Sequence, residues 1–286
     1  MYGKGDWILC MVIDGRKIAE EILFDIRRQA EGLPFTPVFC DVLVGDDPAS
    51  AQYVRMKNQT AQRAGINFLK AEFPGNISTA ELVKEIKRLS REPDLCGLIV
   101  QLPLPGGLDK QRVLNAIDPR VDVDCIGSVN EKRFYGAGDF LDYPTAAAIL
   151  KILDSLGRNF VEKNFLVLGQ GQLVGRPVSR LLKRRGYFVD TATRATENIA
   201  ALLEKADVVI TAAGSPGFIT GGMIKPGAVV IDAGTSEAQA GGIVGDVDFA
   251  SVSRVAGAVS PVPGGVGPVT VACLLANVLK VAKNKI

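Results

Sequence analysis

The chain has 286 residues, of which 33 are basic and 31 acidic, giving a net charge of +2, and 47% are hydrophobic. This balance gives no sign of a nucleic-acid or membrane partner, and the length suggests two domains with a globular core. The chain has no histidine, and its 5 cysteines are scattered without a CxxC pair. We therefore expect no metal site, reduced thiols and a cytoplasmic location.

The first half of the chain alternates predicted helices with predicted strands. Residues 1–10 precede this pattern, and we treat them as an extension. Helices are predicted within residues 16–32, 50–65 and 76–92, and buried strands within 37–45, 66–74 and 95–105. Such alternation, with strands that are apolar throughout, indicates a parallel α/β sheet.

After residue 140 the same rhythm starts again. Helices are predicted within residues 145–157, 176–182, 198–206 and 270–286, and strands within 164–168, 187–193, 207–214 and 228–234. This second α/β unit has the strand–helix–strand order that is typical of dinucleotide-binding folds.

A glycine-rich turn joins a strand to a helix in this second unit. Gly169, Gly171 and Gly175 follow the strand FLVL and precede the helix RPVSRLL. Glycines let the backbone approach a pyrophosphate, and the helix N-terminus supplies N–H donors. The spacing is GxGxxxG rather than GxGxxG, so a purely structural turn is the alternative.

The end of the next predicted strand bears on the choice of cofactor. No acidic residue at its tip could accept a hydrogen bond from a ribose 2′-hydroxyl, and Arg194 lies just beyond it. An arginine at this place suits a 2′-phosphate and therefore NADP. A solvated loop arginine is the alternative.

Tyr53 and Lys57 are four residues apart on the helix predicted within 50–65, so they share one face. In a chain without histidine, Lys57 is a candidate for proton transfer. The spacing alone favours an ordinary surface pair.

Six segments carry a resemblance to a known family. They are LVGDDPAS…YVRMK, GLIVQLPLP, DVDCIGSVN, GQGQLVGRP, GDVDF and SPVPGGVGPVTVA, in this order. From about Met11 to its end the chain resembles the bifunctional methylenetetrahydrofolate dehydrogenase/cyclohydrolase family. The resemblance implies NADP-dependent oxidation of 5,10-methylenetetrahydrofolate to the 5,10-methenyl cation, followed by hydrolysis to 10-formyltetrahydrofolate. It also implies two α/β domains, the second of the Rossmann type, with an active-site cleft between them. The first domain is expected to comprise residues 11–143 together with the C-terminal helix 269–286. The second domain is expected to comprise residues 144–268.

The resemblance also implies roles for individual residues. Lys57 would handle the proton of the attacking water, Tyr53 would pack against the folate, Gln101 would hydrogen-bond Lys57, and Asp124 would bind the pterin ring. The implied substrate contacts are Tyr53, Lys57, Val100, Gln101, Leu102, Asp124, Pro263, Gly264 and Gly265. The implied cofactor contacts are Gly169, Gln170, Gly171, Val174, Gly175, Arg194, Ala213, Gly214 and Thr235.

The chain departs from the family pattern at several of these segments. It has Thr193-Arg194 at the end of the strand predicted within 187–193, and Cys125 where the family has a glycine. It also has Asp142-Tyr143 before the helix predicted within 145–157. NADP remains the expected cofactor over NAD, and the expected partners are a small folate substrate and a second copy of the chain in a homodimer. The alternatives are a family member with dehydrogenase activity alone, a different two-domain NADP dehydrogenase such as a shikimate-type enzyme, and a non-catalytic regulator that binds folate or nucleotide.

Overall fold

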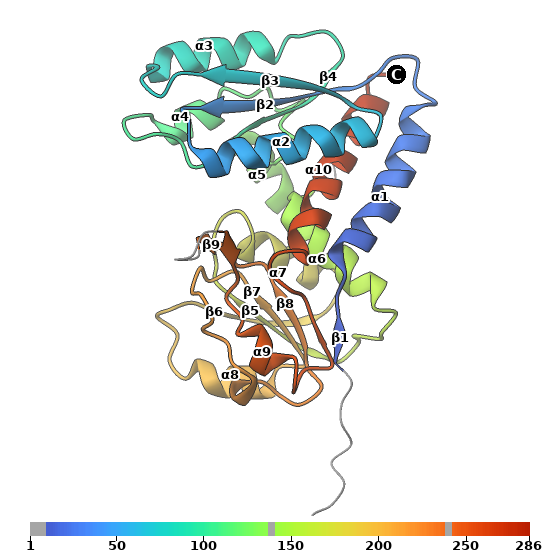
Figure 1. Cartoon of the computed structure of the whole chain (residues 1–286), viewed down its shortest axis with the longest axis vertical. Helices are drawn as coiled ribbons and strands as arrows, with labels where there is room; N and C mark the ends of the chain where they lie inside the picture. Colours follow the sequence, from blue (N-terminus) through green and yellow to red (C-terminus); the bar gives the residue numbers. More distant parts are fainter. Residues whose placement is uncertain (1–9, 137–140, 238–241) are drawn as a thin grey trace, which may run out of the picture. The chain divides into compact units, whose positions relative to one another are not determined.

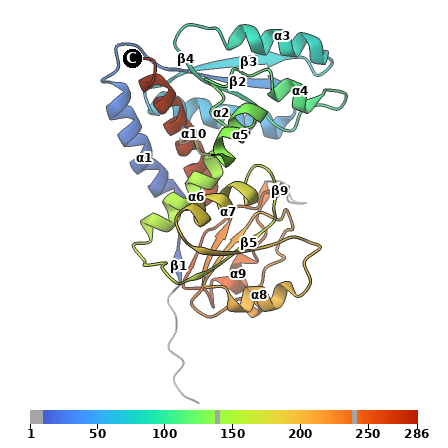
Figure 2. The same ribbon diagram turned by 180° about the vertical axis from the view of Figure 1, so that it is seen from behind.

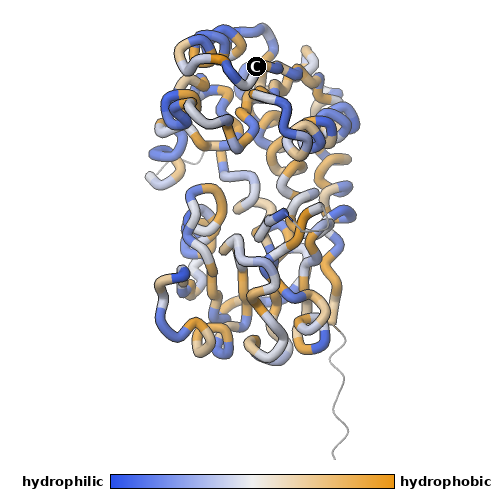
Figure 3. The backbone as a smooth tube through the Cα atoms, turned by 60° about the vertical axis from the view of Figure 1, so that its left-hand side comes forward, coloured by the Kyte–Doolittle hydropathy of each residue, from blue (hydrophilic) through white to orange (hydrophobic). Residues whose placement is uncertain are grey.

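The computed structural model describes residues 10–136, 141–237 and 242–286. The chain divides into two compact units. One comprises Met1–Ala19 with Thr145–Thr270, and the other comprises Glu20–Pro144 with Val271–Ile286. We call them the six-stranded unit and the three-stranded unit, after their main sheets. Figure 3 shows hydrophobic (orange) stretches running through the inside of each unit, in line with cores built from buried aliphatic side chains.

The three-stranded unit contains a parallel sheet with the order β3-β2-β4. Its strands are β2 (Val38–Val44), β3 (Asn67–Phe73) and β4 (Leu95–Val100). Its helices are α2 (Pro48–Arg63), α3 (Thr79–Leu89), α4 (Lys110–Leu114) and α5 (Ser128–Tyr135), with most of α1 (Gly15–Ala30). All six residues of β4 are buried, as expected for a parallel strand that is covered on both faces. Figure 1 shows α2 and α3 beside this sheet.

Side-chain caps fix where the helices of this unit begin. The Ser78 side chain accepts a hydrogen bond from the Glu81 backbone N–H, and the Glu81 carboxylate accepts one from the Ser78 N–H. This capping box satisfies two backbone donors that the helix cannot satisfy itself. Asp47 caps α2 in the same way through the N–H of Ser50, so the helix that carries Lys57 has a defined start.

The last helix, α10 (Val266–Lys283), completes the three-stranded unit with its residues from Val271 onward. The Asn277 side-chain amide donates to the carbonyl oxygens of Val123 and Asp142, each at 2.8 Å. A Cβ at Gly97 would lie 2.7 Å from Val278 Cγ2, so β4 and α10 pack with no room for a side chain there. Among the described residues, α10 is the helix long and apolar enough to cross a membrane, but 67% of it is buried, which is typical of a core helix.

The six-stranded unit is built on a fully parallel sheet with the order β1-β11-β8-β7-β5-β6. Its strands are β1 (Met11–Val12), β5 (Asn164–Leu168), β6 (Phe188–Ala192), β7 (Val208–Thr211), β8 (Val229–Asp232) and β11 (Ala258–Val259). The connecting elements are α6 (Pro144–Ser155), α7 (Gly175–Arg184), α8 (Ile199–Lys205), η1 (Gly221–Met223), α9 (Phe249–Val252), and the small ribbon β9 (Ser236–Glu237) with β10 (Ile243–Val244). Figure 2 shows α7 and α8 beside the sheet strands.

The order of the strands reverses at β5 in this sheet. β5 pairs with β6 on one side and with β7 on the other. The strand after β5 is therefore added at one edge of β5, and the strands from β7 onward are added at its other edge. In open α/β sheets this switch point, at the carboxyl ends of the strands, is where ligands bind.

The expected domain bounds differ from the observed units at the N-terminus. The sequence predicts that the first domain starts at residue 11, whereas Met11 and Val12 pair with Ala258 and Val259 in the six-stranded sheet. A strand of two residues is too short to show periodicity, so its pairing is set by tertiary contacts alone. The α/β class and the parallel sheets are confirmed, and the cleft between the domains stays a prediction.

Candidate active site

A buried lysine is the central feature of the three-stranded unit. Helix α2 directs Lys57 inward, and its side chain is only 7% exposed. Its Nζ donates to Gln101 Oε1 at 2.8 Å and lies 2.7 Å from Asp41 Oδ2. The contact between Lys57 and Gln101 is the one that the family resemblance implies.

Gln101 is held at the carboxyl end of β4. Its backbone N–H donates to the Val42 carbonyl at 2.8 Å, which extends the β2–β4 pairing by one residue. Its side-chain Nε2 donates to the Leu102 carbonyl at 2.9 Å, and this bond leaves Oε1 for Lys57. Val100 precedes Gln101 as the last residue of β4 and is buried.

Asp124 and Tyr53 occupy less buried positions in the same unit. Asp124 is partly exposed, and desolvation together with the nearby Asp122 carboxylate raises its pKa to about 6, although Lys57 opposes the rise. Tyr53 lies one turn before Lys57 on α2 and is 37% exposed, so its ring is open to a ligand. The three-stranded unit therefore contains an aromatic ring, a carboxyl group, an amide and the amine of Lys57.

Sequence reasoning missed Asp41, which touches Lys57. Asp41 lies in the middle of β2 and is 0% exposed. The signal was present in the sequence, since an acid stands inside the apolar run VFCDVLV. Acids are almost never fully buried without a partner, so such a residue indicates a buried cation opposite it.

The glycine turn after β5 has no room for side chains at two positions. Gly169 has φ +85°, and a Cβ there would lie 2.2 Å from the Ala212 carbonyl oxygen. A Cβ at Gly175 would lie 1.8 Å from the Gly169 carbonyl oxygen. Nothing lies within 4 Å of a Cβ at Gly171, so the tip of the turn is open. The turn therefore offers exposed backbone at the start of α7, beside the switch point, as a pyrophosphate needs.

Arg194 bridges the ends of β6 and β7. Its Nη2 donates to the Gly214 carbonyl at 3.2 Å and to Ser215 Oγ at 3.0 Å. Asp246, which the sequence does not predict as a site residue, fixes the turn at residues 213–215 that Arg194 contacts. The Asp246 carboxylate accepts from the N–H groups of Ala213 and Ser215, at 2.7 and 2.6 Å, and from the Thr211 hydroxyl at 2.7 Å.

The remaining predicted residues of this unit lie after β8 and after β11. Thr235 is exposed just beyond β8. Gly264 has φ +106°, and a Cβ at Gly265 would lie 2.6 Å from the Pro261 carbonyl oxygen, so the loop that follows β11 requires its glycines. The Gly264 carbonyl also accepts from the N–H of Gly15 at 3.1 Å, which ties the loop to the start of α1.

The predicted site residues therefore form two groups. Tyr53, Lys57, Gln101 and Asp124 belong to the three-stranded unit, and the glycine turn, Arg194, Thr235 and the Pro263–Gly265 loop belong to the six-stranded unit. Over the described ranges, no group of three or more acidic, cysteine or histidine side chains is placed to hold a metal ion.

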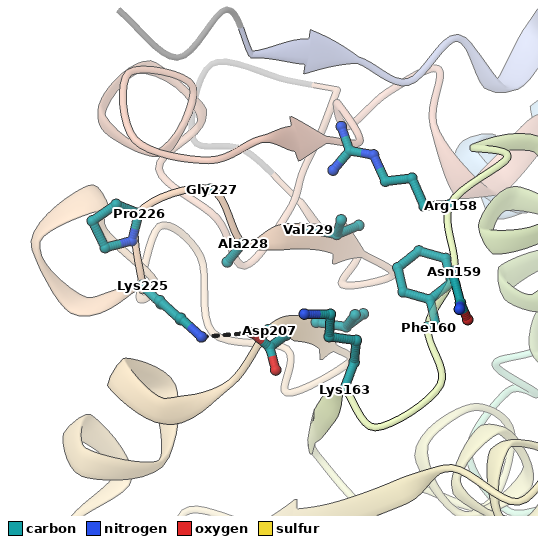
Figure 4. A pocket seen from close by; sticks show the side chains of 11 residues that line it. Arg158, Asn159, Phe160, Lys163, Asp207, Lys225, Pro226, Gly227, Ala228 and Val229 are labelled. Atoms are coloured by element: carbon teal, nitrogen blue, oxygen red, sulfur yellow. Dashed lines mark hydrogen bonds and ion pairs between the residues drawn. The ribbon is translucent and has the colours of Figure 1, made fainter. Parts of the chain in front are cut away.

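A shallow pocket lies elsewhere on the six-stranded unit (Figure 4). Its lining includes Asp207 and Ala228, which immediately precede β7 and β8, and Lys163, which precedes β5. Lys225 is paired with Asp207 there at 2.6 Å. The pocket is therefore at the amino ends of the strands, opposite to the glycine turn, and is separate from the predicted cofactor site.

The fold and these groups define a class of protein. The chain combines a fully parallel sheet, which has a glycine turn at its switch point, with a buried lysine–amide pair. These features are typical of a nucleotide-dependent α/β enzyme. Comparison with known proteins identifies the family. Residues 13–124 match the tetrahydrofolate dehydrogenase/cyclohydrolase catalytic domain, and residues 143–286 match the NAD(P)-binding domain of the same family. The chain belongs to the tetrahydrofolate dehydrogenase/cyclohydrolase family.

Individual relatives cover nearly the whole chain. A bifunctional protein FolD of Acidiphilium cryptum is 42% identical over 94% of this chain and 96% of its own length. The crystal structure of the bifunctional FolD enzyme of Campylobacter jejuni matches with a TM-score of 0.92 and 32% identity, over 97% of this chain and all 100% of that one. The Trypanosoma brucei enzyme, solved with NADP and an inhibitor, matches with a TM-score of 0.90 and 34% identity, over 96% of this chain and 98% of that one. These matches confirm the family resemblance and the NAD(P) cofactor, and they exclude a shikimate-type assignment.

Proposed function

We propose that this chain oxidises 5,10-methylenetetrahydrofolate with NADP⁺ and hydrolyses the resulting 5,10-methenyl cation to 10-formyltetrahydrofolate. The observation that carries the proposal is the buried contact between Lys57 Nζ and Gln101 Oε1. A buried lysine on α2 that contacts the carboxyl end of a parallel strand, in a chain that has no histidine, is suited to proton transfer.

The first reaction needs no general base. The lone pair of folate N5 expels the hydride, so no proton has to be removed, and the absence of histidine is compatible with the chemistry. The chain's own contribution is to bind and orient the folate. We assign the exposed ring of Tyr53 to packing against the substrate, and the carboxylate of Asp124 to accepting hydrogen bonds from the pterin.

The second reaction requires a group that exchanges a proton with water. We assign this role to Lys57, which takes a proton from water as the oxygen bonds to the methenyl carbon. The carbon–N5 bond then breaks while N5 gains a proton and the new hydroxyl loses one. The sum consumes one water and releases one proton. Gln101 keeps the Lys57 amine in place through its Oε1.

The six-stranded unit fits the dinucleotide. The open tip at Gly171 gives the pyrophosphate access to the backbone, and Arg194 at the end of β6 suits the 2′-phosphate of NADP. When bound, NADP⁺ accepts the hydride. The residues assigned to holding it are Gly169, Gln170, Gly171, Val174, Gly175, Arg194, Ala213, Gly214 and Thr235.

The cellular setting and assembly follow from the same proposal. We expect a cytoplasmic enzyme, because the cysteines of the described chain are free thiols, and we expect a homodimer. A chain that has kept the dehydrogenase alone, or a non-catalytic binding protein, is the competing outcome.

A two-part absorbance assay on the purified chain separates these outcomes. One sample receives 5,10-methylenetetrahydrofolate with NADP⁺ or NAD⁺, and the other receives the methenyl compound alone. Reduced cofactor with NADP⁺ in the first, and loss of methenyl absorbance faster than in buffer in the second, would support the proposal. Reduced cofactor alone would indicate a dehydrogenase, and two flat traces would indicate a binding protein.

A further inference from the structure

Asp41 is a second buried charged group beside Lys57, contributed by a different element. It lies on β2, between β3 and β4, and its backbone pairs with both neighbouring strands. Its Oδ2 is 2.7 Å from Lys57 Nζ, and its side chain is 0% exposed. Its Oδ1 has no hydrogen-bond partner within the described part of the chain.

Such a carboxylate is costly unless a cation compensates it. Burial raises the pKa of Asp41, and the charge and hydrogen bond of Lys57 oppose the rise. The adjacent strand residues Cys40 and Val42 are fully buried and offer no charge. Lys57 is therefore the group that opposes the loss of charge on Asp41, and a carboxylate 2.7 Å from an ammonium group stabilises that ammonium electrostatically.

We propose that Asp41 is a positioning residue for the hydrolytic reaction. From its place on β2, Asp41 holds Lys57 in position, and it stabilises the ammonium group that forms when Lys57 takes a proton from water. This inference rests on the role proposed for Lys57. It assigns to Lys57 two fixed neighbours, an amide at the end of β4 and a carboxylate within β2.

Charge balance gives the reason for a carboxylate at this place. The methenyl substrate is a cation, and an isolated ammonium group next to it would repel it. The Lys57–Asp41 pair is neutral overall, so a protonated Lys57 can lie beside the cation at a lower cost. 5,10-Methylenetetrahydrofolate lacks this positive charge, so the oxidation depends less on the pair.

Other titratable groups of the described chain also act on the pair or lie beside it. Asp124 interacts with both Lys57 and Asp41, Asp122 interacts with Asp124, and Tyr53 shares the helix of Lys57. The thiol of Cys40 interacts with Asp41, and its pKa is raised to about 12 mainly by burial, so it stays neutral in the working range of pH. Asp124 is therefore the second group whose titration enters a pH profile, and the test has to separate it from Asp41.

The test is the pH dependence of both reactions in Asp41→Asn. Without the carboxylate, Lys57 loses its proton more easily, so the acidic limb of the hydrolysis profile moves to lower pH by about 1 to 3 units, the usual effect of one close opposite charge. The rate on the plateau falls, because a weaker base accepts the proton less readily. The pH profile of the oxidation should not shift, because that reaction requires no proton transfer by Lys57. Because the Asp41 charge also raises the pKa of Asp124, the comparison is repeated in the Asp124→Asn background, where a limb caused by Asp124 is absent and the shift caused by Asp41 should remain.

Two further variants keep the result interpretable. Val42→Ala removes a fully buried side chain from the next position of β2, so it lowers stability without changing charge and should leave the acidic limb unmoved. Asp41→Val suits a buried parallel strand and repeats the test if the asparagine variant folds poorly. An acidic limb at the wild-type pH in either folded Asp41 variant would overturn the inference. If instead Lys57→Met hydrolyses the methenyl compound at the wild-type rate, it is the proposed role of Lys57 that fails.

Discussion

The side-chain oxygen of Gln101 accepts a hydrogen bond of 2.8 Å from the ammonium group of Lys57, although the two residues are 44 positions apart in the chain. The helix α2 supplies the lysine, and the end of β4 supplies the amide. Parallel sheets bring functional groups together at the carboxyl ends of their strands, and this pair is an instance of that rule.

Replacing Gln101 with alanine removes the amide that orients Lys57. We expect hydrolysis of the methenyl compound to fall by about 10- to 100-fold, since small displacements of a catalytic group have effects of this size. The oxidation should fall less. Stopped-flow absorbance with both substrates measures the two rates. Gln111→Ala, on the exposed face of α4, is the matched control and should leave both rates unchanged. Equal losses in both reactions of Gln101→Ala would contradict an orienting role in hydrolysis.

The pKa of Asp124 is raised to about 6, so its charge changes within an accessible range of pH. Above pH 6 the carboxylate accepts hydrogen bonds from the pterin with its full charge, and below pH 6 the neutral acid is a weaker acceptor. We expect the KM for methylenetetrahydrofolate to rise up to about tenfold per pH unit below 6. In Asp124→Asn the KM should be high at pH 8 and nearly independent of pH. A wild-type KM that stays constant between pH 5 and 8 would refute the assignment.

Unfolding does not explain such a rise in KM. A carboxyl whose pKa is higher in the folded protein than the ordinary 3.8 favours folding most below 3.8, and this contribution is lost as the pH increases through 6. Acidification to pH 5 therefore strengthens this contribution of Asp124. Thermal unfolding recorded at the same pH values checks that the fold persists.

Arg194 should determine the preference for NADP. Replacement with alanine removes a charged donor for the 2′-phosphate, so we expect the KM for NADP⁺ to increase by about 10- to 100-fold. The KM for NAD⁺ should stay within about twofold, because NAD⁺ lacks that phosphate. Arg254→Ala, an exposed arginine near the amino ends of the strands, serves as the control. A parallel increase for both cofactors would instead indicate that Arg194 only supports the Gly214–Ser215 turn.

The glycine turn should not tolerate a methyl group at Gly175. An alanine Cβ there would lie 1.8 Å from the Gly169 carbonyl oxygen, so the turn would have to open. We expect loss of NADP binding by calorimetry together with a lower melting temperature. Gly222→Ala is the control, since nothing lies within 4 Å of its Cβ. Unchanged NADP affinity in Gly175→Ala would show that the turn does not hold the cofactor.

The long elements of the fold could be predicted from the sequence, whereas the two-residue strands could not. β5 and α7 have clear apolar patterns with glycines between them, and they lie where the pattern places them. β1 and β11 have only two residues each, and their pairing depends on contacts between segments almost 250 positions apart, which no local pattern contains.

The candidate site, like the fold, could be predicted only in part from the sequence. Family motifs gave Lys57 and Gln101, and the structure places them in contact. Asp41 and Asp246 were missed, because a buried acid is interpretable only when its partner is known. Asp41 faces Lys57, while Asp246 accepts the N–H groups of Ala213 and Ser215. The partners lie on distant segments of the chain, Lys57 on α2 and Ala213 and Ser215 in the turn after β7, so sequence spacing does not reveal them.

The most direct test is to measure both reactions of Lys57→Met, a replacement that keeps most of the side chain's length and removes its charge and its donors. We predict that hydrolysis of 5,10-methenyltetrahydrofolate falls by about 10²- to 10⁴-fold, the usual contribution of a proton-transfer group. The NADP⁺-dependent oxidation of 5,10-methylenetetrahydrofolate should remain measurable, because it requires no proton transfer. Hydrolysis at the wild-type rate in a folded Lys57→Met enzyme would contradict the account, since the proton would then be handled by another group.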